Sequence, residues 1–169
     1  DRVVITSGLS KAYGLPGLRI GWIASAPDFV AATWARHDYT SIAPGTLSDR
    51  LASVALQPQT RAKILARTRR ILHANLPVIM DWLDAHKDRF SYVPPEAGAI
   101  VYARYGGGIN STELVERLRV EKSVLIVPGD HFGMDGHLRI GFGSETRYLR
   151  DGLDRLADLL RSVPAGPRA

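Results

Sequence analysis

A short stretch near the start of the chain carries the residues with the clearest chemical potential. Lys11 follows Ser10, and Arg19 lies eight positions after the lysine, among glycines. A serine hydroxyl and the N–H donors of a guanidinium group suit a phosphate. A lysine amine that is partly shielded from water becomes a nucleophile that can form an imine. A nucleophilic lysine beside a phosphate clamp is what the cofactor pyridoxal 5'-phosphate (PLP) needs.

The same stretch matches a longer pattern, GLSKAYGLPGLRIG, which runs from Gly8 to Gly21. Over its fourteen positions it resembles the PLP-attachment signature of the class I/II aminotransferases. The resemblance implies that Lys11 is the catalytic lysine, which holds PLP as a Schiff base, and that Ser10 and Arg19 bind the cofactor phosphate. For a lone lysine and arginine, the better interpretation would be a surface position in a glycine-rich hairpin. Some members of the family have a phosphate-binding serine where this chain has Gly8.

A second candidate lies near the C-terminus, where Arg139 stands in an otherwise apolar segment, residues 137–143. An arginine on such a strand must find an anion or reach solvent. The resemblance implies that Arg139 binds the substrate α-carboxylate, for which a two-pronged guanidinium contact is strong and orienting. The alternative is an arginine that pairs with an acid of the chain or extends its side chain to reach solvent. Gly98 resembles a small residue lining the substrate entrance, and the alternative is a plain turn glycine.

Other residues are weaker candidates. Tyr13 could shape the cofactor pocket, or it could simply pack. Arg36 and Tyr39 lie where the family places residues that reach a neighbouring subunit. His131 and His137 do not predict a metal site, because no acids or cysteines converge with them.

Composition limits the other classes of function. The chain has 169 residues, a net charge of +5, 45% apolar residues and no cysteine, so disulfide and thiolate chemistry are excluded. No run approaches the roughly 20 apolar residues of a membrane-spanning helix. The arginines alternate with acids, which indicates solvated helix faces rather than a nucleic-acid surface. We therefore expect no nucleic-acid partner and no membrane partner.

The elements that must position these residues follow from periodicity and breakers. A strand, a tight loop and a second strand are expected around the lysine motif, and Pro77 should kink a long helix. We expect Asn110 or Ser111 to cap one later helix and Ser144 to cap the last one. Helices are predicted over 27–37, 46–56, 59–89, 111–121 and 145–163, and strands over 90–93, 99–105, 124–127 and 137–142.

This order of elements predicts an α/β fold. With the resemblance, it implies the end of the large PLP-binding domain over 1–58, a connecting helix over 59–89 and a small C-terminal α/β sandwich over 90–163. A disordered tail is expected over 164–169. Members of the family are much longer, and their lysine motif falls in the second half. The chain is therefore expected to be a C-terminal portion, which is inactive alone because the residues that hold the cofactor ring lie upstream.

The resemblance implies a PLP-dependent aminotransferase that uses amino-acid and 2-oxo-acid substrates, as a cytoplasmic homodimer in the complete protein. Two alternatives stay open at this point. One is an enzyme of the same fold with another outcome, such as a lyase or an oxidase/cyclase of a basic amino acid. The other is a non-enzymatic effector domain of a regulator, although no helix-turn-helix pattern is present in this chain.

Overall fold

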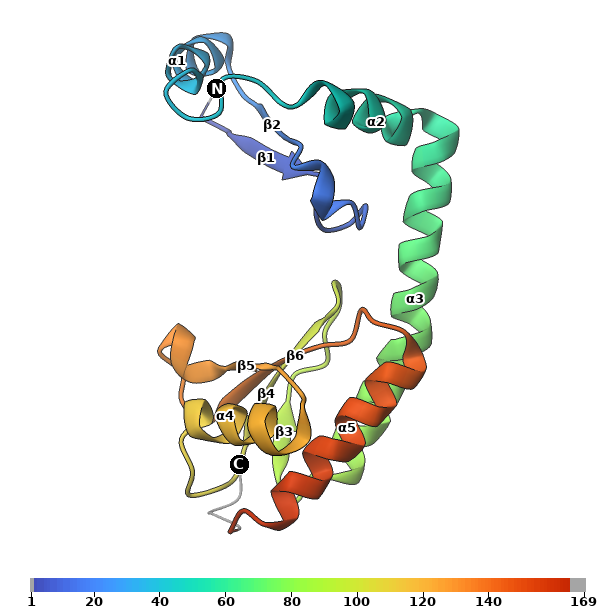
Figure 1. Ribbon diagram of the computed structural model, residues 1–169, viewed down its shortest axis with the longest axis vertical. Coiled ribbons are helices and arrows are strands. Elements are labelled where there is room, and N and C mark those ends of the chain that lie inside the picture. Colours follow the sequence, from blue (N-terminus) through green and yellow to red (C-terminus); the bar gives the residue numbers. More distant parts are fainter. Residues whose placement is uncertain (1, 165–169) are drawn as a thin grey trace. The chain divides into compact units, whose positions relative to one another are not determined.

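The computed structural model describes residues 2–164 and has the α/β fold that the sequence predicts (Figure 1). Its helices are α1 (Pro27–His37), α2 (Thr46–Leu56), α3 (Pro58–Ala85), α4 (Ser111–Lys122) and α5 (Thr146–Arg161), with short 3-10 helices η1 (Pro16–Leu18) and η2 (Gly129–Phe132). Its strands are β1 (Ile5–Gly8), β2 (Gly21–Ala24), β3 (Phe90–Tyr92), β4 (Ile100–Tyr105), β5 (Val127–Pro128) and β6 (His137–Gly141). Two compact units meet in the chain between Arg69 and Arg70, within α3. The predicted tail lies, apart from Pro164, outside the described residues.

The first unit is built on an antiparallel hairpin of β1 and β2, which pairs Gly8 with Gly21. The two strands approach closely at this pair. A Cβ added to Gly8 would lie only 3.0 Å from the carbonyl oxygen of Ile20. One further bond, from Leu9 N–H to the Ile20 carbonyl (3.0 Å), continues the ladder past the ends of the strands. The predicted order of strand, tight loop and strand is therefore confirmed, and the loop is held at its base.

The core of the first unit is small. It consists of Leu9, Tyr13 and Ala52, with partly buried side chains from the lysine motif and from α3 against them. Many large apolar side chains of this unit are exposed instead, and Trp34 on α1 is 67% exposed. So much exposed apolar area is unusual for a surface that faces solvent and typical of an interface.

The predicted long helix is present as α3, which spans 28 residues and continues through Pro77. It begins at Pro58, which suits a first helical position because proline has no N–H to leave unpaired. The predicted end at residue 89 is wrong, since α3 stops at Ala85. A turn follows it, in which His86 N–H donates to the Leu83 carbonyl, and this turn leads into β3.

The second unit is an antiparallel sheet of order β3-β4-β6-β5 (Figure 1). Its core combines Val101, Ala103, Leu138 and Ile140 of the sheet with apolar side chains of α3, α4 and α5. Side chains alternate between the two faces of a strand. Leu138 and Ile140 point into this core, so His137 and Arg139 lie on the opposite face of β6.

A buried asparagine ties α3 to the segment that follows β6. Asn75 is fully buried, and its amide nitrogen donates to the carbonyls of Phe142 (2.8 Å) and Ser144 (2.7 Å). Its amide oxygen accepts from the hydroxyl of Thr146 (2.7 Å). Because buried polar groups need partners, this network fixes how the chain leaves β6 and enters α5.

Two local predictions in this unit are wrong. Residues 124–126 are not a strand, and only Val127 and Pro128 pair with β6. Ser144 does not cap α5, because the N-cap is Glu145 and the Ser144 carbonyl is engaged by Asn75. The predicted cap of α4 is confirmed, since the side chain of Asn110 accepts from Thr112 N–H at 2.9 Å.

Candidate functional site

The hairpin of the first unit brings Ser10, Lys11 and Arg19 to one end. The bond between Leu9 and Ile20 is the last rung of the ladder, so Ser10 and Arg19 come next on the two arms and Lys11 follows. Leu9 is fully buried, whereas the side chains of Lys11 and Arg19 are exposed. A buried leucine thus anchors the turn, and the amine and the guanidinium are presented to solvent.

The turn after the lysine is closed by two backbone bonds. Gly14 N–H donates to the carbonyl of Lys11 (2.8 Å), and Leu15 N–H donates to the carbonyl of Leu9 (2.9 Å). Gly14 has φ +64, a left-handed conformation that glycine adopts without a steric cost. These bonds return the chain to η1, which ends at Leu18 and has Arg19 as its C-cap.

Arg19 has a backbone conformation that is uncommon for its residue type. Its φ and ψ are 53° and 39°, in the left-handed region. One guanidinium nitrogen donates back to the carbonyl of Pro16 (2.9 Å). No carboxylate pairs with Arg19 within residues 2–164. Such conformations cluster at binding sites, and the remaining donors of this arginine are available to an anion.

These three side chains fit PLP by their chemistry. A primary amine can attach an aldehyde, while a hydroxyl and a guanidinium can donate to a phosphate. At Gly8, which pairs with Gly21, β1 and β2 approach closely. A side chain here would bring Cβ to 3.0 Å from the Ile20 carbonyl, a tight contact with backbone that has little freedom to yield.

Tyr13 links this turn to α3 through contacts that the sequence did not predict. Its ring is buried, its hydroxyl accepts from Nε of Arg61 (3.0 Å), and its carbonyl accepts from Nη2 of Arg67 (3.1 Å). The sequence separations are 48 and 54 residues, so no local pattern could reveal these pairs. Arg67 belongs to a basic stretch with Arg69 and Arg70, and the sequence pattern of that stretch favours a solvated helix face.

Arg139 lies in the second unit, on the sheet face away from the helices. It pairs in register with Tyr102 on one side and Val127 on the other, and it is half-buried. No carboxylate of the described residues pairs with it. Its guanidinium is therefore available for a carboxylate that comes from outside the described chain.

The surroundings of Arg139 are aromatic. The ring of Tyr102 stacks on His137 (5.2 Å between centroids) and meets Phe132 edge-on (6.3 Å). The hydroxyl of Tyr102 is buried and has no hydrogen-bond partner among residues 2–164. Tyr102 and His137 also line a hollow of about 650 Å³ on this face. The sequence pointed to Arg139 alone and did not predict this cluster of aromatic side chains.

Gly98 lies in the same unit, just before β4, with φ +83. Its neighbour Ala99 accepts from Phe142 N–H (2.8 Å), which extends the pairing of β4 with β6 beyond Gly141. A Cβ at Gly98 would meet nothing within 4 Å. The positive φ accounts for the glycine, and its place at a substrate entrance stays a prediction.

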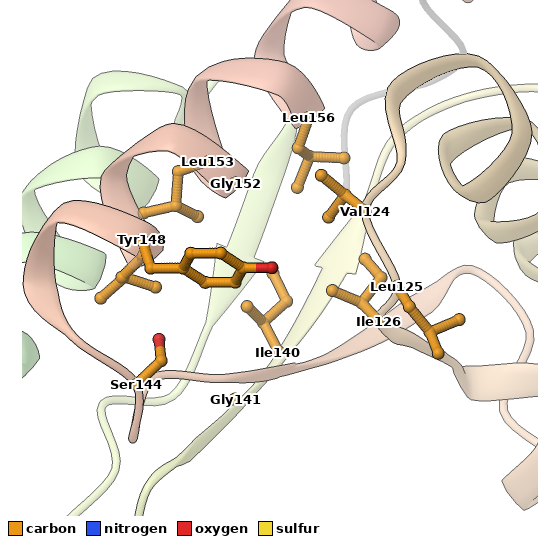
Figure 2. Close-up of a pocket in the computed structure, with 11 residues that line it drawn as sticks. Val124, Leu125, Ile126, Ile140, Gly141, Ser144, Tyr148, Gly152, Leu153 and Leu156 are labelled. Atoms are coloured by element: carbon orange, nitrogen blue, oxygen red, sulfur yellow. The ribbon is translucent and has the colours of Figure 1, made fainter.

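The second unit also has an apolar pocket of about 210 Å³, which is separate from the candidate residues. Figure 2 shows it between residues 124–126, the end of β6 and α5, with the ring of Tyr148 lying across it. None of the predicted site residues lines this pocket.

Two weaker candidates of the first unit show no binding contact within residues 2–164. Arg36 donates to the Ala32 carbonyl of its own helix, and Tyr39 is exposed.

Comparisons with known proteins agree with the lysine motif. The family model for aminotransferase class I and II matches residues 1–156. Capreomycidine synthase of Streptomyces vinaceus is 34% identical over 168 residues, which are 99% of this chain and 43% of that protein. Aromatic-amino-acid aminotransferase 2 of Thermococcus litoralis is 26% identical, over 95% of this chain and 42% of that protein.

Solved structures give the same result. A PLP-dependent aminotransferase from Streptococcus suis superposes with a TM-score of 0.90 at 33% identity, over 95% of this chain and 42% of that one. The PLP-dependent cyclase OrfR superposes with a TM-score of 0.83 at 30% identity, over 94% and 43%. The chain thus spans about two fifths of the length of these proteins. PLP is the cofactor that the family and these structures indicate. By its sequence and its fold, this chain belongs to the class I and II aminotransferase family.

Proposed function

We propose that the complete protein is a PLP-dependent aminotransferase, which transfers the amino group of an amino acid to a 2-oxo acid. The observation that carries this proposal is the hairpin end at which Ser10, Lys11 and Arg19 follow a closed ladder. Catalysis is assigned to Lys11, phosphate binding to Ser10 and Arg19, and substrate binding to Arg139 and Gly98.

The residues of this chain have distinct roles in such a reaction. PLP, when bound, acts as an electron sink for the bond that breaks at the substrate α-carbon. Ser10 and Arg19 donate to its phosphate, and Lys11 provides the amine to which it attaches. Arg139 binds the substrate carboxylate through two parallel hydrogen bonds and so orients the α-carbon. The amine of Lys11, when it is not attached to the cofactor, would take the α-proton of the substrate as general base.

Removal of the lysine amine tests this assignment. In the complete protein, Lys11→Ala should abolish formation of 2-oxo acid from any amino donor that the unaltered protein accepts. The matched control is Lys63→Ala. Lys63 is exposed on α3, and its replacement should leave turnover unchanged. Turnover that survives Lys11→Ala would contradict the proposal.

The domain organisation and the assembly belong to the same proposal. Residues 1–58 would end the large domain, 59–89 would connect, and 90–163 would form the small domain. Support comes from the exposed apolar side chains of the first unit, which include Val3, Ile5, Trp34, Leu47 and Leu51. The rest of a large domain and a second subunit of a homodimer would cover them. No helix of residues 2–164 is long and apolar enough to cross a membrane, and the cytoplasmic location stays a prediction from the resemblance.

A second candidate function has an observation of its own. Identity is 34% to capreomycidine synthase and 30% to the cyclase OrfR, but 25–26% to three relatives named aspartate aminotransferase. The matches to capreomycidine synthase and OrfR support a PLP enzyme of the same fold with another outcome, such as an oxidase/cyclase of a basic amino acid, although the Streptococcus suis aminotransferase ranks between them at 33% identity. A product assay separates the two: a 2-oxo acid supports the aminotransferase, and a ring-closed product or ammonia supports the alternative.

A further inference from the structure

Besides apolar packing, two side-chain hydrogen bonds attach the turn that carries Lys11 to α3, and both go to one residue, Tyr13. Two arginines of α3 hold the two ends of that residue. Nε of Arg61 donates to the phenol oxygen at 3.0 Å, and Nη2 of Arg67 donates to the main-chain carbonyl at 3.1 Å. The side chain and the backbone of Tyr13 are therefore fixed at the same time, by donors that carry positive charge.

This attachment acts where the turn itself is weakly held. The two backbone bonds that close it leave Ser10, Lys11 and Ala12 without a partner strand. Lys11 is exposed, so packing does not restrain its amine. Buried Tyr13 lies two positions later, and its place sets the position of the lysine backbone. Hydrogen bonds from charged donors are the stronger kind, which suits the two arginines to this task.

The glycine after Tyr13 makes room for one of these contacts. A Cβ at Gly14 would lie 2.9 Å from Nη2 of Arg67, at a backbone φ of +64°. A side chain at this position would push the guanidinium away from the Tyr13 carbonyl. Gly14 thus serves the turn by its conformation and serves the arginine by its size.

We propose that Arg61 and Arg67, acting through Tyr13, are positioning residues that hold the Lys11 amine where it attaches PLP. This inference rests on the proposed function, because it assumes that Lys11 is the attachment point. It extends that function to two arginines whose side-chain hydrogen bonds go to Tyr13 and not to Lys11. Their effect reaches the lysine through two hydrogen bonds and a buried ring.

The test uses the complete protein, prepared with PLP and as the apo form. The variants are Tyr13→Phe, Arg61→Met, Arg67→Met and the double variant Tyr13→Phe/Arg61→Met. Arg69→Met is the matched control, because Arg69 is exposed on α3 and makes no side-chain hydrogen bond within residues 2–164. Two properties are measured: the dissociation constant of PLP from the apo form, and the pH midpoint of the visible absorbance of the lysine-bound cofactor.

We expect the three single variants to weaken PLP binding roughly three- to tenfold, as loss of a partly exposed charged hydrogen bond does. The pH midpoint should shift as well, because it reports the surroundings of the lysine nitrogen. The double variant should be no weaker than Arg61→Met alone, since both substitutions remove one and the same bond. Arg69→Met should leave both properties unchanged.

The outcomes distinguish this inference from the function on which it rests. Unchanged affinity and midpoint in Tyr13→Phe and Arg61→Met would overturn the inference, as would equal changes in Arg69→Met. If borohydride still fixes PLP on Lys11 in those variants, only the positioning role fails. Fixation on another lysine would overturn the proposed function and the inference together. Should Arg61→Met fail to fold, Tyr13→Phe decides alone, because it removes only one oxygen atom.

Discussion

Replacement of Asn75 by alanine should destabilise the second unit strongly. The amide of Asn75 makes all its side-chain bonds in a fully buried place: two to the carbonyls of Phe142 and Ser144, and one from the hydroxyl of Thr146. Alanine would leave three polar groups without that partner. An unpaired buried group costs about 1–3 kcal/mol. Because part of this site can relax toward water, we expect a loss of roughly 3–5 kcal/mol in the free energy of unfolding.

Urea unfolding of the complete protein measures this loss, and Thr146→Val is the control. Valine at position 146 removes only one of the three bonds, so it should cost about 1 kcal/mol. Hydrogen exchange of the peptide over residues 137–146 locates the effect, because the Asn75 network fixes the end of β6. If Asn75→Ala lowers the free energy of unfolding no more than Thr146→Val does, the Asn75 network does not have the proposed role. The same holds if hydrogen exchange rises elsewhere but not in this peptide.

Three further predictions concern binding and pH. Arg139→Ala should raise the KM for the amino acid and lower kcat/KM, by an amount that corresponds to roughly 2–3 kcal/mol more activation free energy, while PLP binding persists. Unchanged kinetics with every amino acid would contradict the carboxylate role. Arg19→Ala should weaken PLP retention on the apo form but keep Lys11 as the attachment point, and equal retention would contradict the phosphate role. The backbone N–H of Ser111 lowers the pKa of Asp135 below its ordinary value of 3.8, so the stabilisation is present above that value and lost as pH falls through the depressed pKa. Melting temperature should therefore drop as pH falls below 3.8, less steeply in Asp135→Asn, and parallel curves would disprove it.

Local rules predicted most elements of this fold. The bounds of α1 and α2 agree with the predicted ranges, because Pro27 begins α1 and Pro58, two positions after Leu56, limits the end of α2. The Asn110 cap was also predictable, since a short side-chain acceptor meets a free N–H two residues later. In these places the signal lies within a few residues of the structure that it determines.

Tertiary contacts decided the places where the prediction was wrong. Val124 and Ile126 pack against the core from an irregular segment, which apolar alternation cannot distinguish from a strand. Ser144 is a good cap residue, yet its carbonyl is held by Asn75, which lies 69 positions earlier. Partners so far apart in sequence leave no local pattern.

The residues of the candidate site were also predictable where they lie close together in the sequence, and not where they are far apart. The motif revealed Ser10, Lys11 and Arg19 because they lie within one hairpin. It could not reveal Arg61 and Arg67, whose bonds to Tyr13 form only after α3 folds back on the turn. The left-handed backbone of Arg19 also had no sequence signal, since glycine is the usual residue there.

The proposed function depends above all on Lys11 as the residue to which PLP attaches. Borohydride reduction of the complete protein with PLP, followed by peptide mapping, tests it directly. We expect one labelled peptide, which contains Lys11, and no labelled peptide in Lys11→Ala. Label on Lys63, Lys87 or Lys122, or label that survives Lys11→Ala, would contradict it.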